Sequence, residues 1–191
     1  GQVANDPEMS EIPCLVDHVI RPEEMDTLFR GVRFRVLHTP GHAMDHVSYI
    51  TPDNVCYIGD ALMCGRTLHA SRLPYAFNFR QSLETIEKLK DSLADCEALA
   101  VAHCGVLYDH FDDLVDENLR IMEEQLSEVK ALVDHPMSSD EVCAAVCAHM
   151  GVSVSTPKKA QSLERFLRPY LEFMVDEGSH RMVMRGTTLC Y

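Results

Sequence analysis

The 191-residue sequence has no CxxC pair among its eight cysteines and no apolar run near the ~20 residues of a membrane-spanning helix. The missing run excludes an integral helical membrane protein. The polar, acidic residues 1–11 also lack the apolar stretch of a secretory signal peptide. Without paired cysteines or an export signal, we expect reduced thiols and a cytoplasmic protein.

Basic residues are scarce. Seventeen Lys and Arg stand against thirty Asp and Glu, which gives a formal net charge of −13. Such a surface repels phosphate backbones and therefore argues against generic binding of nucleic acids or anionic membranes. Apolar residues make up 46% of the chain, enough to build a packed core in one domain with an appendage or in two small domains.

Apolar periodicity in the first 110 residues predicts a layered α/β unit. Alternating apolar residues indicate strands at 32–37, 47–50 and 55–58, the last two joined by a turn that contains Pro52. A capping pattern at Asn78 begins a helix to about residue 93, and a buried strand follows at 98–102. Residues 61–77 show no regular pattern, so we expect them to be irregular.

The pattern changes to helical spacing from about residue 112. We predict a long helix over 112–134, a short helix that begins with a capping box at Ser138 and Glu141, and a third helix over 157–176. Pro169 is expected to kink or split the third helix. Residues 182–191 indicate a terminal β-hairpin.

Three of the predicted strands end in a side chain that can bind a metal ion. His42 follows the first strand, Asp60 the third and His103 the last. Sites in α/β proteins assemble at the carboxyl ends of strands, and imidazole with carboxylate suits zinc, iron or manganese. One such residue alone is better explained by an ordinary structural role. Three at matching positions favour a metal site.

The motifs around these residues are similar to those of a known superfamily. Residues 39–46 (TPGHAMDH), 57–62 (YIGDAL) and 101–105 (VAHCG) resemble, in order, the later motifs of the metallo-β-lactamase-fold hydrolases. TPGHxxDH is most similar to the β-lactamase-like protein 2 and glyoxalase II-like branch. The resemblance implies that His42 binds a first metal, His103 a second, and Asp60 both. It assigns catalytic roles to Asp60, His46 and Asp45, the last two facing the substrate or supporting the ligands.

The earlier motif of that superfamily, HxHxDH, is absent from the sequence. The resemblance therefore implies an α/β fold in which residues 1–111 form the second half of an αββα sandwich and residues 112–191 a winged-helix-like module. One half-sandwich would expose an apolar sheet face. We therefore expect either a longer polypeptide that supplies the missing N-terminal half or a homodimer. The C-terminal module has 8 basic and 14 acidic residues, which argues against DNA binding.

The expected activity is metal-dependent hydrolysis. By resemblance, a metal-bound hydroxide attacks an ester, thioester, lactone or phosphodiester of a small molecule. We expect two ions, of zinc or else iron or manganese, in the complete domain and at most one weakly held ion in this chain alone. The alternatives are a non-catalytic assembly module and an RNA- or DNA-processing nuclease of the same superfamily.

Overall fold

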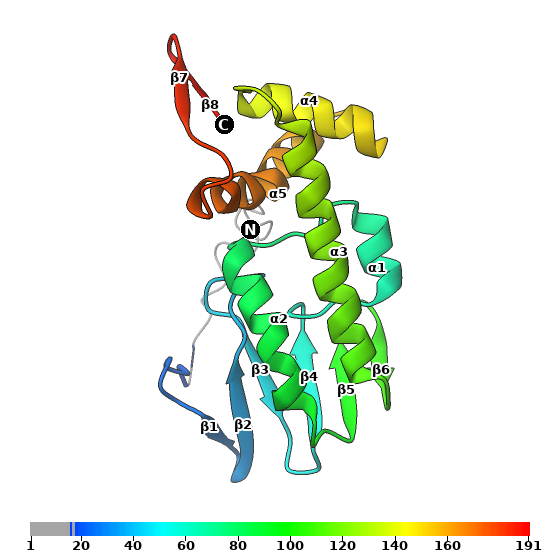
Figure 1. Cartoon of the computed structure of the whole chain (residues 1–191). Coiled ribbons are helices and arrows are strands. Elements are labelled where there is room, and N and C mark those ends of the chain that lie inside the picture. The colour runs from blue at the N-terminus through cyan, green and yellow to red at the C-terminus, as the bar shows by residue number, and fades with distance from the viewer. Residues whose placement is uncertain (1–15, 17) are drawn as a thin grey trace.

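The computed structural model describes residue 16 and residues 18–191, so the acidic first residues and Cys14 lie outside the described part. A six-stranded sheet forms one layer, and helices cover one of its faces (Figure 1). The strands, in spatial and chain order, are β1 Asp26–Phe29, β2 Val32–His38, β3 Val47–Ile50, β4 Val55–Gly59, β5 Ala98–Val101 and β6 Gly105–Leu107.

The strand directions place three loops at one edge of the sheet. Strands β1 to β4 are antiparallel neighbours, so β2 and β4 run the same way. Strand β5 is parallel to β4, because α1 (Gly65–Ser71) and α2 (Phe79–Leu93) connect the two as a crossover. The segments that follow β2, β4 and β5 therefore leave the sheet at the same edge.

Two transverse rows of side chains distinguish the faces of the sheet. Ile50, Cys56 and Leu99 lie side by side in register and are fully buried beneath the helices. The adjacent row runs Val36, Tyr49, Tyr57, Ala100, Val106, and it points to the opposite face because alternate residues of a strand do so. In that row Tyr57 is 56% exposed and Val106 is 51% exposed.

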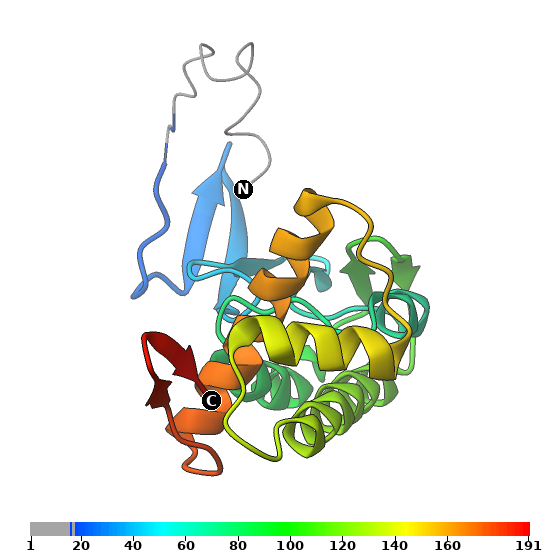
Figure 2. The same ribbon diagram turned by 90° about the horizontal axis from the view of Figure 1, so that it is seen from above.

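The C-terminal helices share the core of the sheet. Helix α3 (Phe111–Leu132) lies beside α1 and α2, while α4 (Ser139–Met150), α5 (Pro157–Asp176) and the hairpin β7–β8 (Val183–Arg185, Thr188–Cys190) lie beyond the sheet edge (Figures 1 and 2). Tyr170 of α5 is fully buried, packs its ring against the tilted ring of Phe79 of α2 and donates a 3.3 Å hydrogen bond to the Pro74 carbonyl. Burial of such aromatic surface fixes α5 against the segment that precedes α2.

Most predicted elements are confirmed with their capping chemistry. The Asn78 side chain accepts a 3.0 Å bond from the Gln81 N–H, and Ser138 and Glu141 form the reciprocal capping box at the start of α4. The terminal hairpin is present. The order of long helix, short helix, long helix and hairpin is as predicted, but its likeness to a winged helix and the division at residues 111/112 stay predictions.

Three features differ from the prediction. Residues 61–77 contain α1, whose first turn closes when the Thr67 and Leu68 N–H groups donate to the Cys64 carbonyl. Strands β1 and β6 were not among the predicted strands. Helix α5 is continuous through Pro169, so the predicted split is absent, while the other predicted outcome, a kink at Pro169, stays a prediction. Leu167, Tyr170 and Leu171 are buried on both sides of the proline and hold the helix to the core. No helix in the described part is long and apolar enough to cross a membrane.

The ion pair between Glu141 and Arg185 ties α4 to the hairpin and predicts an acid-sensitive step. The Ser138 N–H and the Arg185 guanidinium both donate to the Glu141 carboxylate and lower its pKa to about 2. Because the folded pKa is depressed, the stabilisation is complete above the ordinary pKa of 4.5 and is lost as the pH falls to about 2. The stability advantage of the wild type over Glu141→Gln, measured by thermal unfolding, should shrink across that window. An advantage that stays constant from pH 6 to pH 2 would contradict this role.

Candidate active site

The segments that follow β2, β4 and β5 bring the predicted site residues to one edge of the sheet. Asp60 Oδ1 lies 3.5 Å from His103 Nε2. The imidazole rings of His42 and His46 lie 6.5 Å apart, and His42 and Asp60 line the same small cavity. The structure thus places His42, His46, Asp60 and His103 in one neighbourhood, although they are spread over 62 residues of sequence.

His103 is held in an uncommon backbone conformation. Its φ of 61° lies in the left-handed region, within the turn that joins β5 to β6. A non-glycine residue there is strained by a small amount, and such strain concentrates at functional sites. The side chain is 72% exposed. His103 therefore faces solvent beside Asp60, where a ligand can reach it.

His42 is positioned by a glycine and an aromatic ring. Gly41 has a φ of 136°, and a Cβ at this position would come within 2.5 Å of the Ser82 backbone, so only glycine allows α2 to pack this close. The ring of Tyr75 meets the His42 ring edge-on at 5.2 Å. His42 Nδ1 is buried and has no hydrogen-bond partner in the described part of the chain. An unpaired buried nitrogen of this kind calls for a ligand or a water.

His46 ends a buried chain of hydroxyl groups. Its Nδ1 lies 2.7 Å from Thr39 Oγ1, which lies 2.9 Å from Ser48 Oγ, and the Ser48 hydroxyl donates to the Ile58 carbonyl at 3.2 Å. The Thr39 and Ser48 hydroxyls together have two hydrogens, but this chain of hydroxyl groups contains three hydrogen bonds, so one hydrogen must come from His46. With Ser48 donating to Ile58 and Thr39 donating to Ser48, the third bond forms only if His46 Nδ1 donates its hydrogen to Thr39.

This tautomer leaves the lone pair of His46 on Nε2. That nitrogen faces Gly59, where an added Cβ would approach to 2.9 Å, and so points toward the loop that carries Asp60. Burial lowers the pKa of His46 below its ordinary value, and the neighbouring His42 lowers it further, against an opposing effect of Asp60. At neutral pH His46 is therefore an uncharged imidazole with a free acceptor nitrogen.

The fold has clear counterparts among solved structures. A metallo-β-lactamase family protein from Thermus thermophilus is similar with a TM-score of 0.67 and 22% identity over 89% of this chain. A β-lactamase domain protein from Burkholderia ambifaria has a TM-score of 0.68 and 16% identity over 96% of this chain. The chain has the metallo-β-lactamase fold. It spans 52% and 54% of those two structures, or about half of each.

Curated relatives of this metallo-β-lactamase-fold chain are hydroxyacylglutathione hydrolases. The protein from Idiomarina loihiensis is 36% identical over 86 residues, which are 44% of this chain and 31% of that protein. The protein from Glaesserella parasuis is 23% identical over 148 residues, 73% of this chain and 55% of that protein. No protein-family model matches the sequence. The predicted resemblance to glyoxalase II-like proteins is confirmed.

The residues at the sheet edge fit part of the metal site that the metallo-β-lactamase fold implies. Asp60 and His103 form a carboxylate–imidazole pair, and His42 adds a buried ring nitrogen without a partner among the described residues. Nowhere in residues 16 and 18–191, however, do three His, Cys, Asp or Glu side chains come together as a metal-binding group. A metal site with a full set of protein ligands therefore needs further metal-binding side chains, beyond those that the structure describes.

Asp45 is exposed in the turn before β3, directly before His46 in the chain. Within the described residues its side chain forms no hydrogen bond or ion pair with the other predicted site residues. Its catalytic assignment stays a prediction.

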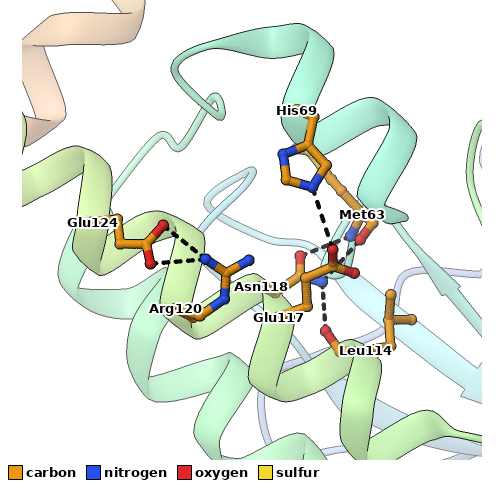
Figure 3. Close-up of polar contacts among 7 residues, drawn as sticks. All are labelled: Met63, His69, Leu114, Glu117, Asn118, Arg120 and Glu124. Atoms are coloured by element: carbon orange, nitrogen blue, oxygen red, sulfur yellow. Dashed lines mark hydrogen bonds and ion pairs between the residues drawn. The ribbon is translucent and has the colours of Figure 1, made fainter.

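Sequence reasoning missed Asn118, which fixes the loop after Asp60. Asn118 is 2% exposed on α3; its Oδ1 accepts from the Met63 N–H at 2.9 Å, and its Nδ2 donates to the Met63 and Leu114 carbonyls, each at 2.8 Å (Figure 3). An amide at helical spacing from Leu114 and Met122, both buried, was the available signal. Asn118 therefore joins the α3 helix to the backbone three residues beyond Asp60.

The hydroxyl chain predicts the tautomer of His46. We expect long-range ¹H–¹⁵N NMR spectra at pH 7 to show a neutral ring that is protonated on Nδ1. In a Thr39→Val variant, which removes the acceptor for that hydrogen, we expect a mixture of tautomers. Protonation on Nε2, or a charged ring at pH 7, in the wild type would contradict the assigned hydrogen-bond directions.

Proposed function

We propose that the protein containing this chain is a metal-dependent hydrolase that cleaves a small ester, thioester or lactone. The observation that carries the proposal is the meeting of Asp60 and His103 at 3.5 Å, with His42 and His46 beside them, at the carboxyl edge of a metallo-β-lactamase-fold sheet. The similarity to hydroxyacylglutathione hydrolases supports a thioester as the first substrate to test.

His42, Asp60 and His103 are the residues of this chain that would hold the metal. Imidazole and carboxylate donors suit zinc first, and iron or manganese as well. A bound metal supplies Lewis-acid polarisation of the substrate and lowers the pKa of water. Asp60 is the one anion of the three, so it contributes the negative charge that compensates the cation and, as a carboxylate, has two oxygens with which to do so.

His46 supplies a proton acceptor at the same edge. Its Nδ1 hydrogen is fixed by Thr39, so Nε2 can accept a hydrogen bond or a proton from water or substrate near Asp60. The lowered pKa keeps this nitrogen unprotonated at neutral pH. Asp45, exposed in the adjoining turn, is proposed to face the substrate and to have a smaller effect.

The remaining metal-binding side chains are proposed to come from a layer that covers the exposed part of the sheet face. In the row that runs from Val36 to Val106, Tyr57 and Val106 are more than half exposed, and no layer of the described residues covers them, whereas Val36 at the other end of the row is buried. We propose that the other half of the sandwich covers this row, and that it belongs to the same polypeptide. A second copy of this chain on that face is the competing outcome, and the solution mass of the polypeptide separates the two.

A non-catalytic assembly module is the second candidate, and it is favoured by the lack of a three-donor group in residues 16 and 18–191. A screen of thioester, lactone and phosphodiester substrates, with the full-length polypeptide and with or without added zinc, distinguishes the two. We expect zinc-dependent thioester hydrolysis. A zinc-loaded polypeptide that hydrolyses none of these substrates but still self-associates would overturn the hydrolase proposal in favour of assembly.

A further inference from the structure

Two cysteines meet beside the Asp60–His103 pair. Cys64 lies four residues after Asp60, and Cys104 directly follows His103. Because β4 and β5 are parallel neighbours, the segments that follow them leave the sheet side by side. There the side chains of Cys64 and Cys104 lie close enough for each thiol to affect the pKa of the other. Cys64 Sγ also lies 3.5 Å from Thr67 Oγ1 at the start of α1.

Exposure distinguishes this thiol pair from the others in the structure. Cys104 is exposed and Cys64 is partly buried. The Cys56 and Cys96 side chains also interact with each other, but Cys56 is fully buried in β4, and burial raises its pKa to about 12. In that second pair neither thiol is exposed. Only a pair with one thiol in solvent can be reached by a soluble oxidant.

We propose that Cys64 and Cys104 form a reversible intramolecular disulfide when the protein meets a small-molecule disulfide such as oxidised glutathione. The exposed Cys104 attacks one sulfur of the oxidant, which forms a mixed disulfide and releases one glutathione thiolate. Cys64 then attacks the Cys104 sulfur and releases the second. Two protein thiols lose two electrons and two protons, and the oxidant is reduced to two glutathione thiols.

The disulfide would join the two loops of the candidate active site. One loop carries Asp60 and the other carries His103, whose side chains are 3.5 Å apart. A covalent link four residues beyond the first and one beyond the second restricts how these groups move when a ligand binds. The resulting reversible loss of hydrolysis rests on the proposed function. Formation of the disulfide does not.

Peptide mapping of the full chain tests the disulfide without any assay of activity. The reduced protein is incubated with oxidised glutathione, its remaining thiols are alkylated, and its peptides are analysed by mass spectrometry. We expect loss of two of the eight thiols, a linked peptide that joins Cys64 to Cys104, and its disappearance on addition of dithiothreitol. In Cys64→Ser, where the second step is blocked, we expect glutathione to stay attached to Cys104.

Two other cysteine pairs are the matched controls. Cys143 and Cys147 lie one helical turn apart on α4, and Cys96 contacts the buried Cys56, so neither Cys143→Ser nor Cys96→Ser should change the linked peptide. A stable glutathione adduct on Cys104 of the wild type, without a linked peptide, would overturn the proposal. A disulfide between Cys56 and Cys96 that forms in place of the Cys64–Cys104 disulfide would also overturn the proposal. If the disulfide forms but hydrolysis is absent even in the reduced protein, it is the proposed function that fails.

Discussion

If the proposed hydrolysis holds, replacing Asp60 by asparagine is expected to lower kcat/KM of the full-length polypeptide by at least about a hundredfold. Replacing a residue that only hydrogen-bonds to a metal ligand lowers metal affinity or activity by about 10–100-fold. Replacing a direct ligand should lower them further. Asparagine keeps the size of the side chain but removes the charge that would balance the cation and that faces His103 at 3.5 Å. Turnover of a thioester, measured together with the zinc content of each preparation, gives the result.

Glu117→Gln is the matched control for the Asp60 prediction. Glu117 is also a carboxylate paired with a histidine, since its Oε1 lies 3.5 Å from His69 Nε2, but it lies on α3 and is not one of the predicted site residues (Figure 3). The same change of charge there should leave turnover and zinc content unaltered. An Asp60→Asn protein with near-normal turnover and full zinc content would contradict the role assigned to Asp60.

Asn118→Ala is expected to lower the free energy of unfolding by about 2–4 kcal/mol, since each buried polar group left unpaired costs roughly 1–3 kcal/mol. The variant leaves the Met63 N–H and the Met63 carbonyl without the partner that now bonds both. Loosening of this loop should also reduce activity, because Asp60 lies three residues before Met63. Urea unfolding of the wild type and the variant measures the change in stability.

Arg120→Ala is the control on the same helix. Arg120 lies two residues from Asn118 and donates two 2.8 Å bonds to Glu124, but both side chains are more than half exposed (Figure 3). Exposed pairs at this spacing contribute about 0.3–0.5 kcal/mol. If Asn118→Ala destabilises the protein no more than Arg120→Ala does, then Asn118 does not anchor the loop.

The elements with a strong local signal could be predicted from the sequence. Helices α2 and α4 begin at side chains that cap their first turns, Asn78 and Ser138, and the strand around Ile58 alternates between buried and exposed residues as expected. The strand around Val36 follows the expected alternation only in part, since Val32, expected on the buried face, is 44% exposed. Helix α1 could not be predicted, because it is short and its burial depends on Leu68 meeting residues far away in sequence. The continuity of α5 through Pro169 depends likewise on tertiary packing, which no local pattern encodes.

The neighbourhood of His42, Asp60 and His103 was predictable, because each follows a strand and these strands end at the same edge of the sheet. Their joint role as metal ligands stays a prediction, since no three such side chains form a metal-binding group within the described residues. The tautomer of His46 depends on Thr39 and Ser48, which lie in different segments. The hydrogen bonds that hold the Met63 backbone come from Asn118, 55 residues away. Such contacts are set by how α3 and β3 pack, and spacing in the sequence does not show them.

His42 is proposed to hold a first metal ion, His103 a second, and Asp60 both. Crystals of the full-length polypeptide grown with zinc, measured at the zinc absorption edge, test this assignment most directly. We predict anomalous density within about 2.0–2.2 Å of an Asp60 oxygen and of imidazole nitrogens of His42 and His103, the usual distances for zinc. Zinc density located elsewhere, with these three side chains free of it, would contradict the account.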